Sequence, residues 1–291
     1  MSETAVPGLS PEIQESVDRY RSGAITRRDL LRSLIAATGS YTAAHLFLET
    51  SGLAATLISQ READAANVTA ETVRYSSGQL QVEGYLVKPK SAGRHPAVIV
   101  IHENRGLNEH IRDMARRFAA EGFVALGPDL LSRAGGTAQM KSEREATDAI
   151  NRLPLYGVID DLKTGFEFLA KHPDVNPQKI AAVGFCWGGW RSFMLATAVP
   201  QLSRAVVFYG SSPASGYENI QASVLAHYAQ WDYQITGNAL WTAERMKQAG
   251  KKFQYYVYPE SEHAFFNDTG NRYNPSAAKL AWTRTLEFLR G

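Results

Sequence analysis

The chain holds a single cysteine, Cys186, whose neighbours suit a reactive thiol. Gly184 and Gly188 stand on either side of it in the Gly-x-Cys-x-Gly form of a nucleophile elbow, with cysteine in the place that serine usually holds. The elbow is a strained strand-to-helix turn, in which larger side chains two residues away would collide. The helix that starts there favours thiolate over thiol. The alternative is a core cysteine beside two packing glycines, because free cysteine is often buried.

A thiol that attacks at neutral pH needs a base, and the chain offers seven histidines. His263 lies in a long loop after the last expected strand, where catalytic groups tend to sit. His102 ends another strand and competes with His263 for the role of base. His227 falls in the middle of a strand and is better interpreted as a core histidine with satisfied hydrogen bonds. Position alone does not decide between His263 and His102.

Asp232 is the candidate for orienting the imidazole. It follows an expected strand, where its carboxylate could accept a hydrogen bond from the far ring nitrogen and fix the tautomer. A turn or helix-cap aspartate is the alternative. The order Cys186, Asp232, His263 favours catalysis, because nucleophile–acid–base is the order of α/β-hydrolases and not of the other familiar triads.

Alternating strands and helices would position these groups. We expect strands at 71–76, 80–88, 96–101, 123–126, 179–183, 205–210, 223–228 and 252–258, and helices at 108–121, 158–169, 191–198, 237–250 and 276–290. This alternation predicts an α/β fold with a mostly parallel central sheet and helices on both faces. Ligands bind such sheets beyond the carboxyl ends of the strands, so Glu103, Cys186, Asp232 and His263 should share one edge. A polar loop is expected at 131–155.

Composition narrows the class of protein. With 291 residues, 44% of them hydrophobic, the chain can form one large domain or two small ones. A net charge of +2 gives no case for a nucleic-acid or anionic-membrane partner. One cysteine excludes an internal disulfide, and no Cys/His cluster has metal-ligand spacing, so we expect no metal and no cofactor. No uninterrupted apolar run is long enough for a stable membrane span.

Residues 1–65 differ from the globular body, which we expect at 66–291. The pair Arg27-Arg28 precedes a moderately apolar stretch of small residues and resembles a twin-arginine export signal. The tripeptide at 63–65 offers an A-x-A-like cleavage site. We therefore expect export to the periplasm or beyond, with the twin-arginine machinery as a partner. The alternative is a helical extension on a cytoplasmic protein.

Five short motifs resemble those of the dienelactone hydrolase family, a cysteine-nucleophile branch of the α/β-hydrolases. They lie at 102–107, 128–130, 184–189, 231–232 and 262–266. The resemblance implies an α/β-hydrolase fold and hydrolysis of a small ester or lactone, as by a carboxymethylenebutenolidase. It also implies that Cys186 is the nucleophile, His263 the base and Asp232 the group that orients the base.

The resemblance assigns further roles around this triad. Glu103 would contact the resting thiol and help to form thiolate when substrate binds. The backbone N–H groups of Asn104 and Trp187 would form the oxyanion hole. Arg133 would hold a substrate carboxylate, and Arg105 is a second candidate for substrate binding.

One departure bears on the substrate. The family places another arginine shortly after the catalytic histidine, whereas Asn267 and Asp268 stand there in this chain. An ester or lactone other than the anionic dienelactone therefore fits at least as well. Two other functions stay open: a thioesterase or amidase that uses the same site, and a non-catalytic binding protein with a hydrolase fold.

Overall fold

The computed structural model describes residues 10–21, 25, 27–39 and 67–291. The chain divides into two compact units, Met1–Ala66 and Asn67–Gly291. In the first unit, helices α1 (Pro11–Arg21) and α2 (Arg27–Thr38) share a small apolar core. This core contains Val17, Tyr20, Leu30 and Leu34. The expected cleavage site at 63–65 lies outside the described residues, and the export signal stays a prediction.

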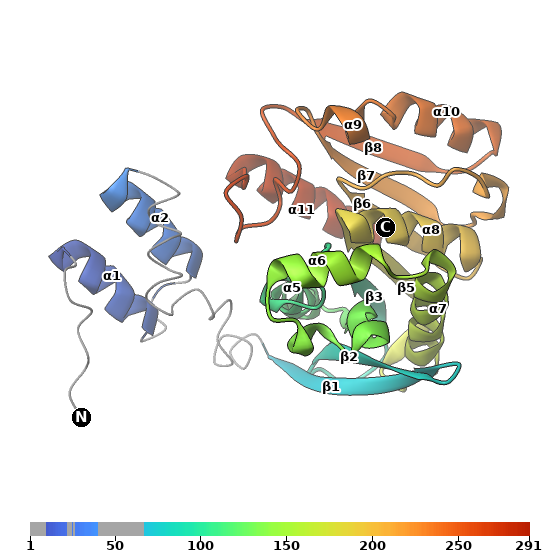
Figure 1. The fold of residues 1–291 in the computed structure, drawn as a ribbon, viewed down its shortest axis with the longest axis horizontal. Coiled ribbons are helices and arrows are strands. Elements are labelled where there is room, and N and C mark those ends of the chain that lie inside the picture. Colours follow the sequence, from blue (N-terminus) through green and yellow to red (C-terminus); the bar gives the residue numbers. More distant parts are fainter. Residues whose placement is uncertain (1–9, 22–24, 26, 40–66) are drawn as a thin grey trace. The chain divides into compact units, whose positions relative to one another are not determined.

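The second unit is built on an eight-stranded sheet with strand order β1-β2-β4-β3-β5-β6-β7-β8 (Figure 1). Strands β1 and β2 pair antiparallel, β2 pairs antiparallel with β4, and all remaining pairs are parallel. The strands are β1 (Val68–Ser77), β2 (Leu80–Pro89), β3 (His95–Ile101), β4 (Val124–Pro128), β5 (Val175–Phe185), β6 (Arg204–Phe208), β7 (Ser223–Ala229) and β8 (Phe253–Tyr258). This is the mostly parallel sheet predicted from the alternating pattern.

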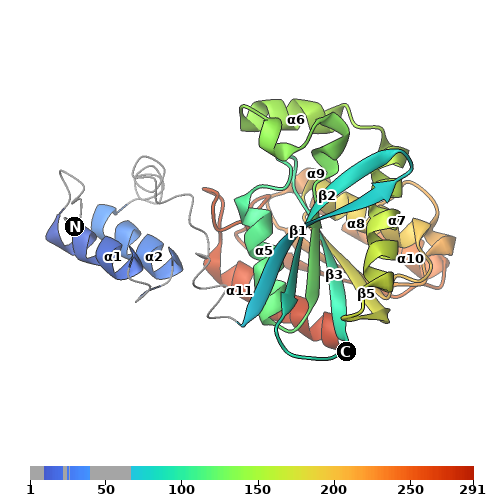
Figure 2. The ribbon, with the colours of Figure 1, turned by 90° about the horizontal axis from the view of Figure 1, so that it is seen from below.

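Helices cover both faces of the sheet, which confirms the α/β-hydrolase architecture. The main ones are α5 (Glu109–Ala120), α7 (Leu155–Lys171), α8 (Trp187–Ala198), α10 (Ala239–Gln248) and α11 (Pro275–Arg290). Figure 2 shows α5 and α11 on one side of the sheet and α7, α8 and α10 on the other. Asn108 caps α5 as predicted, since its side chain accepts a hydrogen bond from the N–H of Ile111.

The central strands form the core because their side chains are covered on both faces. Residues 97–101 of β3 and 205–208 of β6 are fully buried, which explains their continuous β-branched and apolar composition. A parallel sheet with a core of this kind holds the carboxyl ends of β3, β5, β7 and β8 along one rigid edge.

The expected loop at 131–155 contains helix α6 (Glu143–Asn151), so that prediction was wrong. Ser142 caps the helix by accepting a hydrogen bond from the N–H of Glu145, and Glu145 accepts one from the N–H of Lys141. The apolar face of α6, which includes Ala146 and Ile150, packs beside Trp187. The mostly polar composition of the segment concealed a short helix with a narrow buried face.

Within the described residues, no helix combines the length and apolar character that a membrane crossing requires.

Candidate active site

Four candidate residues lie just beyond the carboxyl ends of parallel strands. Glu103 follows β3, Cys186 follows β5, Asp232 follows β7 and His263 follows β8. Since these strands belong to one sheet and run in one direction, the four residues share one edge. The most distant two, Glu103 and His263, are 160 positions apart in the sequence.

Cys186 occupies a strained turn between β5 and α8. Its backbone has φ 54° and ψ −115°, a region that a residue with a side chain rarely adopts. A hydrogen bond from its N–H to the carbonyl of Phe208 ties the turn to β6, and its own carbonyl accepts from the N–H of Gly189. The half-buried thiol stands at the start of a 12-residue helix.

The two glycines that flank the turn are required by space. A Cβ atom on Gly184 would lie 1.9 Å from the carbonyl oxygen of Gly188, and one on Gly188 would lie 2.4 Å from the carbonyl oxygens of Ile101 and His102. Backbone atoms cannot move aside as a flexible side chain can. The close approach also brings the chain after β3, which carries Glu103, against the elbow.

His263 and Asp232 form a close pair beside the elbow. The Nδ1 atom of His263 lies 2.5 Å from Oδ2 of Asp232. The two side chains are 26% and 11% exposed, so water screens the pair only weakly. Asp232 begins the short helix α9 (Tyr233–Thr236) without capping it, because its carboxylate is directed to the histidine.

Backbone hydrogen bonds hold the two loops of this pair together. The N–H of Trp231 donates to the carbonyl of Ser261 over 2.9 Å, and the N–H of Glu260 donates to the side-chain oxygen of Gln230 over 2.9 Å. Asn274 closes the histidine loop by donating from its backbone N–H to Phe265. The distance between Asp232 and His263 is thus fixed by the ends of β7 and β8.

The environment of His263 favours its protonated form. Burial lowers the pKa of the imidazole, but the hydrogen bond to Asp232 and the proximity of Cys186, together with the negative charges of both groups, raise it to about 10. Cys186 thus acts on the imidazole from close range. Cys186 and His263 make no regular hydrogen bond with each other, which is common for a catalytic pair in a site without substrate.

The raised pKa predicts a pH-dependent contribution of His263 to stability. The folded protein holds the His263 proton more tightly than the unfolded chain, whose pKa is near 6.5. The contribution should be complete below about pH 6.5 and should be lost as the pH rises through about 10. Urea unfolding of the wild type and His263→Gln at several pH values measures it. A stability difference that does not shrink over this range would contradict the assignment.

Glu103 is buried, and one of its oxygens has no partner. Its Oε2 accepts a hydrogen bond from Nδ2 of Asn267 over 2.8 Å, whereas Oε1 is enclosed and makes no hydrogen bond. Asn267 stands in the histidine loop, where the family resemblance led us to expect an arginine. An amide therefore holds Glu103 without neutralising its charge.

Tyr209 lies near both His263 and Glu103, and the sequence analysis did not predict it as a site residue. It follows β6 with φ 38°, and its buried ring lies 5.1 Å from the imidazole of His263 between ring centres. Burial and the negative charges of Glu103 and Cys186 raise its pKa well above the ordinary value, so the hydroxyl keeps its proton. The hydroxyl is close enough to Glu103 to feel its charge but makes no regular hydrogen bond.

The two expected oxyanion donors are backbone N–H groups that follow β3 and the elbow. Trp187 is the first residue of α8, so its N–H has no partner within the helix. In the described part of the chain, neither this N–H nor that of Asn104 donates to a protein acceptor. The carbonyl of Asn104 accepts a hydrogen bond from Thr147 of α6, which anchors the loop. Both backbone donors are therefore unoccupied in the described residues, and their role as an oxyanion hole stays a prediction.

The ring nitrogens of the other two candidate histidines, His102 and His227, make hydrogen bonds away from Cys186. His102 is fully buried, with Nδ1 2.6 Å from the carbonyl of Glu103 and Nε2 accepting from the N–H of Leu130. Both ring nitrogens are therefore occupied, and His102 shapes the Glu103 loop rather than acting as a base. His227 bonds to Tyr258 and Thr285, and burial lowers its pKa to about 3, as expected for a core histidine.

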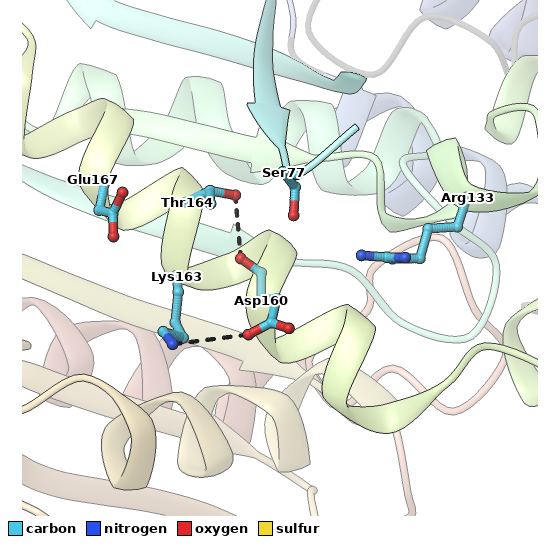
Figure 3. A pocket seen from close by; sticks show the side chains of 7 residues that line it. Ser77, Arg133, Asp160, Lys163, Thr164 and Glu167 are labelled. Atoms are coloured by element: carbon cyan, nitrogen blue, oxygen red, sulfur yellow. Dashed lines mark hydrogen bonds and ion pairs between the residues drawn. The ribbon is translucent and has the colours of Figure 1, made fainter. Parts of the chain in front are cut away.

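The structure does not gather the two predicted substrate-binding arginines with the triad. Asp161 of α7 holds the guanidinium of Arg133 through two hydrogen bonds of 2.7 and 2.9 Å. Arg133 lines a hollow of about 420 Å³ between α7 and the β1–β2 turn (Figure 3). Arg105 is paired at the surface with Glu143 over 3.0 Å. Substrate binding by either arginine stays a prediction.

Comparison with known proteins identifies the family. The sequence profile described as the dienelactone hydrolase family matches residues 82–291. The chain belongs to the dienelactone hydrolase family. A Synechocystis sp. relative, provisionally named carboxymethylenebutenolidase, is 30% identical over 230 residues, which cover 72% of this chain and 92% of the relative. A relative from Saccharolobus solfataricus with the same provisional name is 31% identical over 253 residues, covering 74% and 96%.

A solved structure agrees with this assignment. The crystal structure of a protein from Klebsiella pneumoniae, provisionally named dienelactone hydrolase, matches with a TM-score of 0.71 and 30% identity, over 77% of this chain and 98% of that one. Membership of the dienelactone hydrolase family makes the protein a hydrolase of ester or lactone type.

Proposed function

We propose that the protein hydrolyses a small ester or lactone through a Cys186-His263-Asp232 triad, in the manner of a carboxymethylenebutenolidase. The observation that carries the proposal is the His263–Asp232 pair at 2.5 Å beside a cysteine held at φ 54°. A base oriented by a carboxylate and a strained nucleophile at a helix start are what acyl transfer to sulfur needs.

The reaction would proceed in two steps. His263, whose pKa is raised to about 10, holds the proton of the Cys186 thiol, and the thiolate attacks the acyl carbon to form a tetrahedral intermediate. The N–H groups of Trp187 and Asn104 bind the resulting oxyanion. His263 then gives the proton to the departing alcohol oxygen, leaving a thioester on Cys186, and a water activated by His263 releases the acid.

Glu103 would act on the thiol before attack. Its enclosed, unpartnered Oε1 places a negative charge close to the site, where it opposes the thiolate that protonated His263 favours. We propose that substrate binding moves this carboxylate away from Cys186, which removes its opposition to the thiolate, and that the Cys186 proton stays on His263.

A panel of substrates tests the reaction class. Matched oxygen esters, lactones, thioesters and anilides should be compared by kcat/KM with the full-length protein. We expect turnover of oxygen esters or lactones, with anilides at least about 10²-fold slower because their leaving group is poorer. Turnover confined to thioesters or anilides would favour the second candidate chemistry at the same site, and no turnover of any would favour a binding protein.

Export remains part of the proposal on the strength of the Arg27-Arg28 pair and the small apolar residues that follow it. The intact mass of the protein purified from its native cells tests this point. A mature chain that begins near Ala66 supports export, and retention of residues 1–65 in the cytoplasmic fraction refutes it.

A further inference from the structure

His102, the residue before Glu103, makes two hydrogen bonds that define which of its ring nitrogens carries the proton. Its Nε2 atom lies 3.3 Å from the backbone nitrogen of Leu130, and a backbone N–H can only donate, so Nε2 is the acceptor. Burial lowers the pKa of His102, which keeps the ring neutral and places its one proton on Nδ1. Nδ1 lies 2.6 Å from the carbonyl oxygen of Glu103. His102 therefore donates a hydrogen bond to that carbonyl.

The carbonyl that accepts this hydrogen bond belongs to the peptide group of an expected oxyanion donor. The C=O of Glu103 and the N–H of Asn104 are parts of one planar trans peptide, so they point in opposite directions within one plane. A hydrogen bond to the carbonyl therefore also sets the direction of the N–H. The carbonyl of Asn104 itself accepts a hydrogen bond from Thr147 over 3.0 Å, which fixes the next peptide as well.

The ring of His102 also packs on the residue that carries the second expected donor. It stacks on Trp187 with 5.5 Å between the ring centres and 2° between the ring planes. The guanidinium of Arg191 lies 4.0 Å from the centre of the same indole, so Trp187 has two close neighbours. The main chain of His102 meets the elbow too, since a Cβ on Gly188 would lie 2.4 Å from its carbonyl oxygen. One buried residue thus contacts both segments that would bind an oxyanion.

The segment directly after β4 anchors both ends of the loop that carries Glu103. Leu130 donates to His102 at the start of the loop. At its far end, the hydroxyl of Thr137 accepts from the N–H of Leu107 over 2.9 Å and donates to Asp129 over 2.7 Å. The loop is therefore held in one conformation by side chains before any substrate binds.

We propose that His102 is a positioning residue of the reaction, which orients the N–H of Asn104 towards the oxyanion. This role rests on the proposed hydrolysis and deepens it, because it names the side chain that organises the predicted oxyanion hole. A donor that is already oriented needs no reorganisation when the tetrahedral intermediate forms. The stabilisation is realised only when negative charge develops on the substrate oxygen, so loss of His102 should slow acyl transfer without changing the thiol.

Two substitutions separate the two hydrogen bonds of the ring. The side-chain amide of His102→Asn can place a donor near the position of Nδ1 and keep the bond to the Glu103 carbonyl. The amide oxygen of His102→Gln can take the position of Nε2 and accept from Leu130, but this variant has no donor beside Glu103. We expect kcat/KM for 4-nitrophenyl acetate to fall by about 30-fold or more in His102→Gln and by about threefold or less in His102→Asn.

Two thiol reagents distinguish oxyanion binding from thiol reactivity. Iodoacetamide forms a carbon–sulfur bond to Cys186 and releases iodide, so no oxyanion arises. Phenethyl trifluoromethyl ketone adds Cys186 to its carbonyl carbon, and the carbonyl π electrons pass to the oxygen as an oxyanion. In His102→Gln, we expect the affinity for the ketone to fall as far as kcat/KM, whereas the alkylation rate constant stays within about twofold of the wild type. Equal losses with both reagents would overturn the proposal.

His227 offers a matched control, because it is also fully buried and its two ring nitrogens bond to Tyr258 and Thr285. His227→Gln should lower the Tm, yet the ketone affinity relative to the alkylation rate should stay at the wild-type value. If this ratio fell as far as in His102→Gln, the effect would be a general loosening of the core, and the positioning role would be wrong.

Nitrogen NMR of the wild-type protein needs no variant and covers the case in which neither His102 variant folds. We expect the ring of His102 to be protonated at Nδ1 alone between about pH 6 and 9. A proton on Nε2, or a ring that becomes charged in this range, would overturn the proposal.

These measurements also separate the positioning role from the proposed function. If the wild type hydrolysed no ester, the proposed function would fail, while a selective loss of ketone affinity in His102→Gln would still support the positioning role. If the wild type hydrolysed esters and His102→Gln did so equally fast, the positioning role alone would be wrong.

Discussion

Replacing Cys186 with alanine should lower kcat/KM for 4-nitrophenyl acetate by about 10⁴-fold or more. The variant loses the atom that forms the covalent bond, while the oxyanion donors and the His263–Asp232 pair stay in place. Activity should fall towards the residual level that binding and the oxyanion hole alone support. Initial rates at saturating and subsaturating ester concentrations measure the change.

The variant should keep its fold, so loss of activity cannot be assigned to unfolding. Alanine at position 186 retains the same backbone strain, of order 1–3 kcal/mol, that cysteine bears at φ 54°. Near-ultraviolet circular dichroism and the Tm should therefore change little. Activity within a few-fold of the wild type in a well-folded Cys186→Ala protein would refute the role of the thiol.

The second large effect is expected at Asp232. The Asp232→Asn side chain has nearly the same shape, but it can no longer accept the Nδ1 proton as a charged group and can hold the imidazole in the wrong tautomer. We expect kcat to fall by about 10²–10⁴-fold. The pKa of His263 should also move down from its raised value, because one of the two negative partners that raise it is gone.

Asp160→Asn is a matched control for this variant. Asp160 lies on α7 beside the hollow that Arg133 lines, and it pairs at the surface with Lys163. Removing its charge should leave both kcat and the pH profile unchanged. If Asp232→Asn behaved like this control, His263 would not depend on Asp232 for its orientation.

The sequence was most informative where a residue type is required by the backbone. The roles of Gly184 and Gly188 could be predicted from the sequence. Any side chain at these positions would collide with backbone atoms, so only glycine fits there. The parallel strands were equally visible, since burial on both faces demands continuous apolar runs such as 97–101. These two features together predicted that Cys186, Asp232 and His263 lie at the same edge of the sheet.

Contacts between distant side chains were not visible in the sequence. The amide of Asn267 reaches Glu103 across 164 positions of the chain, and nothing local to either residue reveals the pairing. Arg133 matched a family position, yet its partnership with Asp161 depends on how α7 packs. The order of residues predicts which elements meet, whereas side-chain packing decides which atoms do.

Arg191 illustrates a signal that is present in the sequence but ambiguous. Tryptophans one and four positions before an arginine on a helix can cover it, but the same pattern occurs on exposed helices with no buried charge. Only the structure shows that the guanidinium is enclosed and lacks a carboxylate.

The central claim is that Cys186 carries the acyl group, and trapping that group tests it most directly. The full-length protein is mixed with excess 4-nitrophenyl acetate, quenched in acid within the first turnover, and mapped by peptide mass spectrometry. We predict an added acetyl group on the peptide that contains Cys186, in an amount that matches the burst of nitrophenol, and none in Cys186→Ala. An acetyl group found on another residue during turnover, or a burst that persists in Cys186→Ala, would contradict the account.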